Sequence, residues 1–405
     1  MTSVYEQILD QSNRANPYPL YAELRKTPVA RQDDGSYVVS TYREIVALLH
    51  DPRVSSERLR APDGRPQGAE EGAADMPASF INLDPPAHDA CRRALMRHFG
   101  PPETPDRIEG LRGRTAEIVT TLINGFGDRN QVDIVDDFAY PLPVTVICSL
   151  LGVPREDEPR FSKWANALIE GLDPRTEDPV RLLTTTEREM GAYLNDVIES
   201  HLRNPGDDLL SALAGEDPAR GGLSREQLLV NAILLFVAGH ETTVNLITNG
   251  MLTLLRHPGA LDRLREEPDS VDRIVEELLR YEPPVHFALR RIALTDIEIA
   301  GTTIPKSATI ILALAAGSRD PDRFDDPDKF DPDREDNEHL GFNSGIHYCF
   351  GAPLARLETQ LALTELARRL RNPQLVTDPP PYRPNPRLRG PRHLLVTFDE
   401  IAPSS

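Results

Sequence analysis

The segment 339–358, HLGFNSGIHYCFGAPLARLE, gathers residue types that could do chemistry around one cysteine, Cys349. Three glycines bracket it: Gly341, Gly345 and Gly351. Pro353 suits the first turn of a following helix, and the amide groups and positive end of such a turn would stabilise a thiolate. A thiolate is a ligand for a soft metal or a nucleophile, whereas a lone cysteine is more often a small buried hydrophobic residue. The loop leaves these alternatives open.

Hydrolase chemistry fits the same segment poorly. A serine-hydrolase elbow needs a glycine two residues on either side of the serine, but Gly341 and Gly345 stand three before and one after Ser344. A cysteine hydrolase is the poorest alternative, because His347 is only two residues from Cys349 and no partner that would orient it is evident.

A long apolar segment, 224–257, predicts a helix that runs through the interior. Ser224 and Gln227 form a capping box at its start. In its middle stands Ala238-Gly239-His240-Glu241-Thr242-Thr243. The two small residues would let something flat approach the backbone, and an acid beside two β-branched alcohols can open the helical ladder. A kinked core helix with a solvated glutamate is the alternative interpretation.

Two further groups of charged residues have ordinary explanations when they are taken alone. Glu277 and Arg280 lie three residues apart on a predicted helix, where such a pair is usually a weak surface ion pair. His88 and Arg92 lie one helical turn apart and could bind a pair of carboxylates together with a third basic residue such as Arg291. An ordinary basic helix face is the alternative.

Composition narrows the class of protein. The 405 residues include 45 Lys and Arg against 64 Asp and Glu, a formal net charge of -19, which argues against a nucleic-acid binder. Three cysteines without a C-x-x-C pair exclude a disulfide framework and a thiolate zinc site, and favour a reducing cytoplasm. The N-terminus lacks the pattern of a signal peptide, and the longest apolar run, 228–239, is too short to cross a bilayer. We expect a soluble protein.

Helical periodicity dominates the chain, and its 37 prolines mark the loops between elements. The predicted helices are 19–26, 42–49, 88–99, 107–123, 161–169, 181–203, 225–256, 271–281 and 353–370. The predicted strands are 36–40, 393–398 and a hairpin of 296–300 with 304–312. We find no repeat or long Gly/Ser linker and expect a single domain, 1–405. The Asp/Pro-rich stretch 320–336 lacks the ligand pattern of an EF-hand and predicts a solvated meander.

Three motifs occur together and resemble the signature set of the cytochrome P-450 superfamily, specifically its soluble bacterial members. They are Phe342-x-x-Gly345-x-His347-x-Cys349-x-Gly351, Glu277-x-x-Arg280 and Ala238-Gly239-x-Glu241-Thr242. Their order matches as well, the likeness extends over nearly the whole chain, and the cysteine loop is its most specific part. The resemblance implies a mainly α fold, a triangular helical prism with a small β-rich side, and a haem b held between the long central helix and the cysteine loop.

The resemblance also implies roles for individual residues. Cys349 is the axial thiolate ligand of the haem iron, and Glu241 and Thr242 are the acid–alcohol pair that delivers protons to bound dioxygen. The other residues implied to hold the cofactor are the propionate partners His88, Arg92, Arg291 and His347, the haem-edge residues Ala238 and Gly239, and Gly351 of the cysteine loop. Glu277 and Arg280 become structural and are expected to pair with the meander around Arg334.

Substrate contacts are implied by family position. The residues are Phe236, Val237, His240, Val285, His286, Phe287 and Leu289, with further contacts from the loop 60–83, the region 161–172 and the turn 388–390. They mix apolar and polar groups, which suggests a mostly apolar small molecule such as a polyketide, terpenoid or steroid. Two departures from the family pattern are Asn343, where many members have glycine, and Phe350, where leucine is commoner.

The implied reaction is a monooxygenation that takes dioxygen, two electrons and two protons. Electrons must come from outside, because three cysteines cannot hold an iron–sulfur cluster and no flavin motif is present. We expect a ferredoxin with its reductase, docked on a basic patch of Arg92, Arg93, Arg97 and Arg356, and a cytoplasmic monomer without nucleic-acid or membrane partners. A haem-thiolate peroxygenase and a non-catalytic haem carrier or gas sensor are alternatives, but the intact Glu241–Thr242 pair favours the use of dioxygen.

Overall fold

The structure is a computed structural model that describes residues 2–57, 78–100, 103–171 and 178–404. Contacts within the chain divide it into two compact units. Unit 1 consists of Met1–Ser55, Ala116–Tyr140 and Thr242–Ser405, and unit 2 of Ser56–Thr115 and Pro141–Glu241. This division does not decide whether the chain is a single domain, which stays a prediction.

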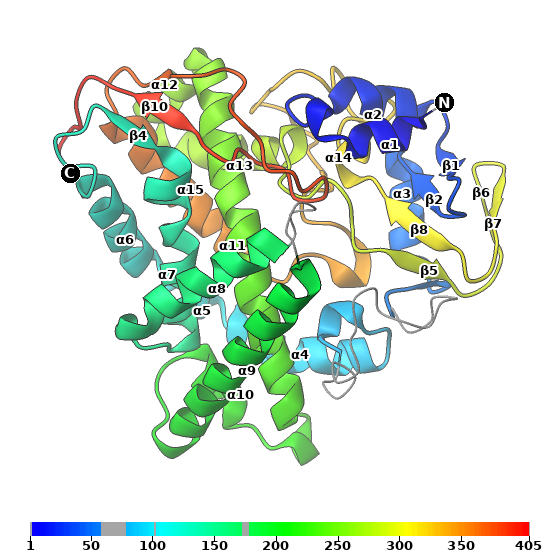
Figure 1. Cartoon of the computed structure of the whole chain (residues 1–405), viewed down its shortest axis with the longest axis horizontal. Coiled ribbons are helices and arrows are strands. Elements are labelled where there is room, and N and C mark those ends of the chain that lie inside the picture. Colours follow the sequence, from blue (N-terminus) through cyan, green and yellow to red (C-terminus); the bar gives the residue numbers. More distant parts are fainter. Residues whose placement is uncertain (1, 58–77, 101–102, 172–177, 405) are drawn as a thin grey trace. The chain divides into compact units, whose positions relative to one another are not determined.

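The predicted predominance of helix is confirmed (Figure 1). The helices are α1 (Val4–Leu9), α2 (Tyr18–Arg25), α3 (Tyr42–Leu49), α4 (Ala87–Phe99), α5 (Pro105–Glu109), α6 (Arg112–Asn124), α7 (Pro141–Leu151), α8 (Glu158–Gly171), α9 (Pro179–Arg203), α10 (Leu209–Ala214), α11 (Arg225–Arg256), α12 (Pro258–Glu266), α13 (Val271–Tyr281), α14 (Leu314–Gly317) and α15 (Ala352–Arg369). The bounds of α3, α11 and α13 are those that periodicity predicts.

The capping box predicted at the start of α11 is present. The amide of Gln227 donates to Ser224 Oγ at 3.2 Å, and the amide of Ser224 donates to Gln227 Oε1 at 3.0 Å. These two bonds satisfy amide groups that the first turn of a helix leaves without an acceptor. The start of the long central helix is therefore fixed by local sequence.

All the described strands belong to unit 1 and are short: β1 (Val29–Arg31), β2 (Tyr37–Val39), β3 (Val54–Ser55), β4 (Gln131–Asp133), β5 (Arg291–Ala293), β6 (Ile297–Ile299), β7 (Thr302–Ile304), β8 (Thr309–Leu312), β9 (Gln374–Leu375) and β10 (Leu395–Thr397). They form a five-stranded sheet of order β1-β2-β8-β5-β3, a three-stranded sheet of order β4-β10-β9, and the hairpin β6-β7. Among the strands of the described residues, only β2 and β8 pair in parallel, with Val38 opposite Ile311.

The five-stranded sheet is buried on both faces, because alternate side chains of its central strands enter different clusters. Tyr37 and Val39 join one cluster with residues of α3 and the β6-β7 hairpin. Val38 and Ile311 join the other, which α1 and α2 supply. Figure 1 shows α1, α2 and α3 beside these strands. Strands that are apolar on both faces suit such a position.

Some predicted elements differ from those observed. The segment 107–123 is two helices, α5 and α6, since α5 ends at Glu109 and Gly110 caps it. The predicted hairpin pairs β6 with β7 through Ala300 and Gly301, both at positive φ, whereas β8 lies in the five-stranded sheet beyond Pro305. Periodicity also missed α7, because its prolines and its apolar residues on nearly all sides hide a helical pattern.

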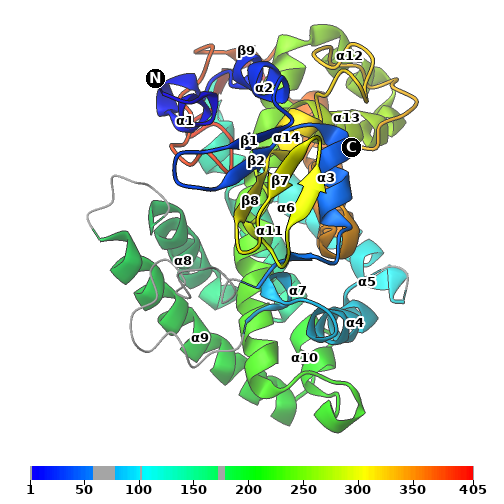
Figure 2. The ribbon, with the colours of Figure 1, turned by 90° about the vertical axis from the view of Figure 1, so that its right-hand side faces the viewer.

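In unit 2, α8 and α9 lie side by side (Figure 2). Phe161 and Trp164 of α8 meet at 5.1 Å between ring centroids, and Tyr193 of α9 lies 5.4 Å from Phe161. Phe236 of α11 contacts Phe161 edge-on at 5.0 Å. These four rings join three helices of unit 2.

Two helical stretches, Ile134–Leu151 and Arg225–Arg256, are long and apolar enough to cross a membrane by length and composition, although the apolar run at 228–239 alone is not. Two thirds of each apolar window (67%) is buried inside the protein. The core helices of a soluble protein pass the same test, so the two stretches are weak grounds for a membrane span.

Candidate functional site

The cysteine loop, residues 339–351, lies against neighbouring backbone at two of its glycines. A Cβ on Gly341 would come within 2.5 Å of the carbonyl oxygen of Leu279, and a Cβ on Gly345 would overlap the carbonyl oxygen of Leu49. Gly345 also has φ +68°, a conformation that side chains disfavour. The glycines are therefore required by close packing of the loop on α13 and α3.

Asn343 has φ +65°, the left-handed conformation. Its own Oδ1 accepts a hydrogen bond from the amide of Ser344 at 2.9 Å. Asparagine is the side chain that tolerates this conformation best after glycine, because such local hydrogen bonds compensate it. Asn343 in place of the family's glycine is therefore compatible with the left-handed backbone conformation at this position.

Cys349 is partly exposed, forms no disulfide, and lies three residues before the first residue of α15. Its amide donates to the carbonyl oxygen of Phe342 at 2.9 Å, which closes the loop. Gly351 is the N-cap of α15, and Pro353 lies in its first turn as predicted. A Cβ on Gly351 would meet no atom within 4 Å. The sulfur therefore stands near the positive end of a helix of 18 residues with free space beside Gly351.

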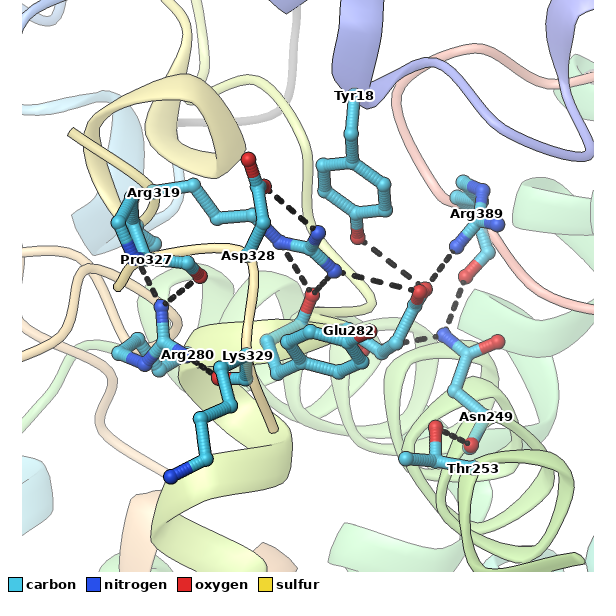
Figure 3. A network of polar contacts seen from close by, with 12 residues as sticks. Tyr18, Asn249, Thr253, Arg280, Glu282, Arg319, Pro327, Asp328, Lys329 and Arg389 are labelled. Carbon is cyan, nitrogen blue, oxygen red and sulfur yellow. Dashed lines mark hydrogen bonds and ion pairs between the residues drawn. The ribbon is translucent and has the colours of Figure 1, made fainter. Parts of the chain in front are cut away.

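Glu277 and Arg280 form a completely buried pair, not the weak surface pair that their spacing alone suggests. Arg280 donates Nε and Nη2 to the two carboxylate oxygens at 2.8 and 2.7 Å. Its other contacts are backbone carbonyl oxygens: those of Pro327 and Lys329 in the meander (Figure 3), and that of Ser318, which precedes the meander. Glu277 accepts from the amide of Asp331 at 2.8 Å, and Arg334 Nε lies 3.6 Å from its Oε2, the contact that the resemblance implied.

The middle of α11 departs from the burial of the rest of this helix. Val237 is 38% exposed and Ala238 is exposed as well, whereas His240 and Glu241 are buried. Thr242 is partly exposed and lies one turn after Ala238, so these residues share one face. Ala238 and Thr242 thus form an accessible strip of small side chains beside the buried His240 and Glu241, which leaves room for a group to lie against it.

The four basic residues expected at the propionates occur in pairs. His88 and Arg92 lie one turn apart on α4 in unit 2; His88 is 1% exposed, with Nδ1 2.8 Å from Asp89 Oδ1. Arg291 of β5 and His347 of the cysteine loop both lie in unit 1, where Arg291 is buried and donates to the carbonyl of Leu289 at 3.1 Å. That the four bind one group stays a prediction.

Comparisons with known proteins decide the family. The family model described as Cytochrome P450 matches residues 37–397. The chain belongs to the cytochrome P450 family. It is 40% identical to cytochrome P450 monooxygenase PikC of Streptomyces venezuelae over 96% of this chain and 93% of that protein. It is 38% identical to the vitamin D(3) 25-hydroxylase of Pseudonocardia autotrophica, over 87% of this chain and 85% of that protein.

The fold is that of the same family. The structure of cytochrome P450 CYP109Q5 from Chondromyces apiculatus matches with a TM-score of 0.88 at 32% identity and covers 98% of both chains. The protein is therefore a cytochrome P450 monooxygenase with the mainly α P450 fold that the sequence predicts. Bacterial members of this family act on small molecules with dioxygen and redox partners.

Membership of the P450 family implies a haem-thiolate cofactor, and this chain's residues fit it. The cysteine loop offers one soft sulfur donor at a helix N-terminus. Beside Gly351 and along the open strip on α11, small residues leave space that larger side chains would fill. Each of these features is present in the polypeptide itself.

Among the residues predicted to contact substrate, Val237 is exposed and Val285 and Leu289 are partly exposed. Phe236 is completely buried against Phe161, and His240 stacks on it with 7° between the ring planes. For Phe236, this burial favours a packing role; contacts of all five residues with substrate stay predictions.

His286 and Phe287 are also buried, on the side of α2. His286 Nδ1 lies 2.8 Å from Tyr21 Oη, and Phe287 contacts the rings of Tyr5 and Tyr21. Burial, together with three nearby arginines, holds the pKa of His286 well below its ordinary value, so the imidazole is neutral. Both residues pack the N-terminal helices onto the sheet. The predicted substrate loop 60–83 lies largely outside the described residues.

The basic patch expected for ferredoxin is partly engaged within the protein. Arg97 Nη2 pairs with Glu216 at 2.8 Å. Arg356 donates to both oxygens of Glu276 at 2.6 and 2.9 Å. Burial opposes ionisation of Glu276, but hydrogen bonds from Arg356 and His339 outweigh it and lower its pKa to about 2. Arg93 is exposed.

Sequence reasoning passed over two acids in unit 1, one buried and one partly buried. Glu358 lies on α15, 2% exposed, and burial raises its pKa to about 8. The sequence feature that could have revealed Glu358 is an acidic residue on an apolar helix face, four residues from both Leu354 and Ala362. Glu282 follows α13 and binds several aromatic and basic side chains (Figure 3). Its partners are far apart in sequence, so local patterns do not reveal them.

The conformation of Asn343 generates a prediction. Asn343→Gly should leave the stability unchanged within error, whereas Asn343→Val should lower the free energy of unfolding by about 1–2 kcal/mol, because a β-branched side chain disfavours φ +65°. Chemical denaturation of the two variants beside the parent measures this. Equal stability of the valine and glycine variants would contradict the assigned conformation.

Proposed function

We propose that this cytochrome P450 binds haem b through Cys349 and inserts one oxygen atom from dioxygen into a mostly apolar small molecule. The observation that carries the proposal is the single sulfur donor at the N-terminus of α15, with free space beside Gly351. The open strip of Ala238 and Thr242 on α11 supports it, since haem is flat and needs a small-residue surface.

The carboxylates of the haem need compensating charge where they leave water. We assign them to His88, Arg92, Arg291 and His347, as the resemblance implies. The burial of His88 and Arg291 supports the assignment, because buried basic side chains are suited to strong, charge-assisted hydrogen bonds.

When bound, the haem supplies the activation of dioxygen, and electron donation from its thiolate ligand favours cleavage of the O–O bond. Glu241 and Thr242 then serve proton delivery on the strip side. Glu241 is 7% exposed, so its carboxyl group exchanges protons with few competing waters, and the Thr242 hydroxyl one residue on can donate at the partly exposed face.

The proposed substrate is a medium-sized to large, mostly apolar molecule of the polyketide, terpenoid or steroid type. Val237, Val285 and Leu289 supply apolar, accessible side chains. The relative named for vitamin D(3) hydroxylation supports this class.

The electron donor we propose is a ferredoxin with its reductase, and the proposed location is the cytoplasm, where the protein acts as a monomer. The supporting feature is an exposed basic residue, Arg93 on α4, in a chain of net charge -19.

The haem proposal predicts an absorption spectrum. The purified protein, reduced with dithionite and saturated with carbon monoxide, should show the strongly red-shifted Soret band of a thiolate-ligated haem. Cys349→His should abolish that band while the protein remains folded. A spectrum of histidine-ligated haem in the parent would contradict thiolate ligation, and the absence of haem would contradict the whole proposal.

The proton-delivery role predicts uncoupling. In Thr242→Ala, product formed per NAD(P)H oxidised should fall about tenfold or more, with hydrogen peroxide rising, because a positioned proton donor contributes on the order of 10²–10⁴ to rate. Thr243→Ala, the neighbouring buried threonine, is the matched control and should stay coupled. Unchanged coupling in Thr242→Ala, or peroxide-driven turnover that exceeds turnover with dioxygen, would favour a peroxygenase or carrier instead.

The ferredoxin surface predicts a salt-dependent rate. Arg93→Glu should slow reduction by ferredoxin about tenfold at low ionic strength, and the difference should shrink as salt screens the charges. Arg203→Glu, at the exposed end of α9, is the control for a change of net charge alone. A rate that is equal in both variants and independent of salt would exclude docking on this patch.

A further inference from the structure

Two extended segments of unit 1 form a short ribbon that carries predicted substrate contacts. Val285 and Leu388 pair as an antiparallel bridge. Beside it the amide of Arg389 donates to the carbonyl oxygen of Pro284 at 2.9 Å. Val285 and the turn 388–390 are both expected to face substrate. The position of this ribbon therefore determines the position of part of the surface that lines the substrate site, here called the substrate wall.

The ribbon is attached to α11, the helix that carries Thr242. Asn249 Nδ2 donates to the carbonyl oxygens of Arg389 at 3.0 Å and Glu282 at 3.3 Å. A Cβ on Gly390 would overlap the side-chain amide of Asn245, so only glycine lets the chain approach this close. Asn249 lies seven residues, or about two turns, after Thr242. The ribbon and the alcohol are therefore held on one rigid element.

A charged centre holds the ends of the ribbon. The carboxylate of Glu282 accepts a hydrogen bond from Tyr18 Oη at 3.1 Å and pairs with Arg389, while Arg319 Nη2 lies 3.5 Å away (Figure 3). Glu282 directly precedes the first ribbon segment, and Arg389 is part of the second. One carboxylate thus joins both segments to Tyr18 of α2.

The partners of this carboxylate are themselves tightly packed. The Arg319 guanidinium carbon lies 3.4 Å from the ring centroid of Tyr18 and 3.9 Å from that of Tyr281. Arg389 is 1% exposed and donates to the carbonyl oxygens of Arg14 and Ala15, each at 2.8 Å. Buried charges with several fixed partners allow few alternative geometries, so they hold the backbone to which they belong.

We propose that Glu282 and Tyr18 are positioning residues for substrate selection: they set the position of the Val285–Leu388 ribbon against α11 without touching the substrate. The proposal rests on the function proposed above, in that the ribbon forms part of the substrate wall. It assigns selectivity to an N-terminal tyrosine that lies 264 residues from Glu282 along the chain.

Tyr18→Phe is the sharpest test, because it removes one hydrogen bond to Glu282 and keeps the ring between Arg319 and Arg389. Glu282→Gln is a second variant, which keeps the shape of the side chain and removes its charge. Tyr42→Phe is the matched control: Tyr42 Oη donates to the carbonyl oxygen of Glu338 at 2.8 Å, in unit 1 but away from the ribbon.

The experiment is a spectral titration of the haem-bound protein with two ligands of the iron. Imidazole is small and binds the iron without contacting the substrate wall, whereas clotrimazole is bulky and apolar and must pack against that wall. Tyr18→Phe should change the Kd for clotrimazole about three- to tenfold, the scale of one hydrogen bond to a charged group, and leave that for imidazole unchanged. Thermal unfolding of each variant measures stability separately.

Equal shifts for both ligands, no shift for either, or the same clotrimazole shift in Tyr42→Phe would overturn the proposal and leave a structural role only. If Glu282→Gln fails to fold, the result for Tyr18→Phe still decides between a positioning role and a structural role alone. Failure of the proposed function has a different signature, because the parent protein would then show no spectral response to imidazole.

Discussion

The buried ion pair of Glu277 and Arg280 is the interaction on which the cysteine side of unit 1 depends. Two charges removed from water are costly unless each is paired and hydrogen-bonded, and here the fork of Arg280 meets both oxygens of the carboxylate. The partners of the pair come from α13 and from the meander that leads into the cysteine loop. Loss of one charge would leave the other buried without a partner. The meander and α13 therefore remain packed together or lose their packing together.

How far the sequence predicts the site depends on whether the cause is local. The proline in the first turn of α15 and the capping box of Ser224 were predictable, because each follows from backbone geometry within a few residues. Residue type also pointed to Cys349, but the reason for Gly341 and Gly345, contact with the carbonyls of α13 and α3, needs the tertiary structure.

The rest could not be predicted because it depends on partners far apart in sequence. Phe236 and Phe287 are apolar side chains in plausible positions for substrate, and only the fold puts them against Phe161 and Tyr21. Strands of two or three residues carry too little alternation to be detected, and the helix α7 is apolar on nearly every side. Ion-pair partners such as Glu276 for Arg356 are likewise set by tertiary packing.

The meeting of Tyr18 with Glu282 and Arg389 has a consequence for the order in which the chain folds during synthesis. Unit 2 ends at Glu241, so all its residues have been synthesised before residues 242–405 of unit 1 are added. Unit 1, in contrast, joins segments that lie far apart along the chain: Tyr18 binds Glu282, which pairs with Arg389, and β4 (Gln131–Asp133) pairs with β10 (Leu395–Thr397). Helix α2 can therefore complete its contacts with this charged centre only after Arg389 has been made, and closure of unit 1 is a late, long-range event.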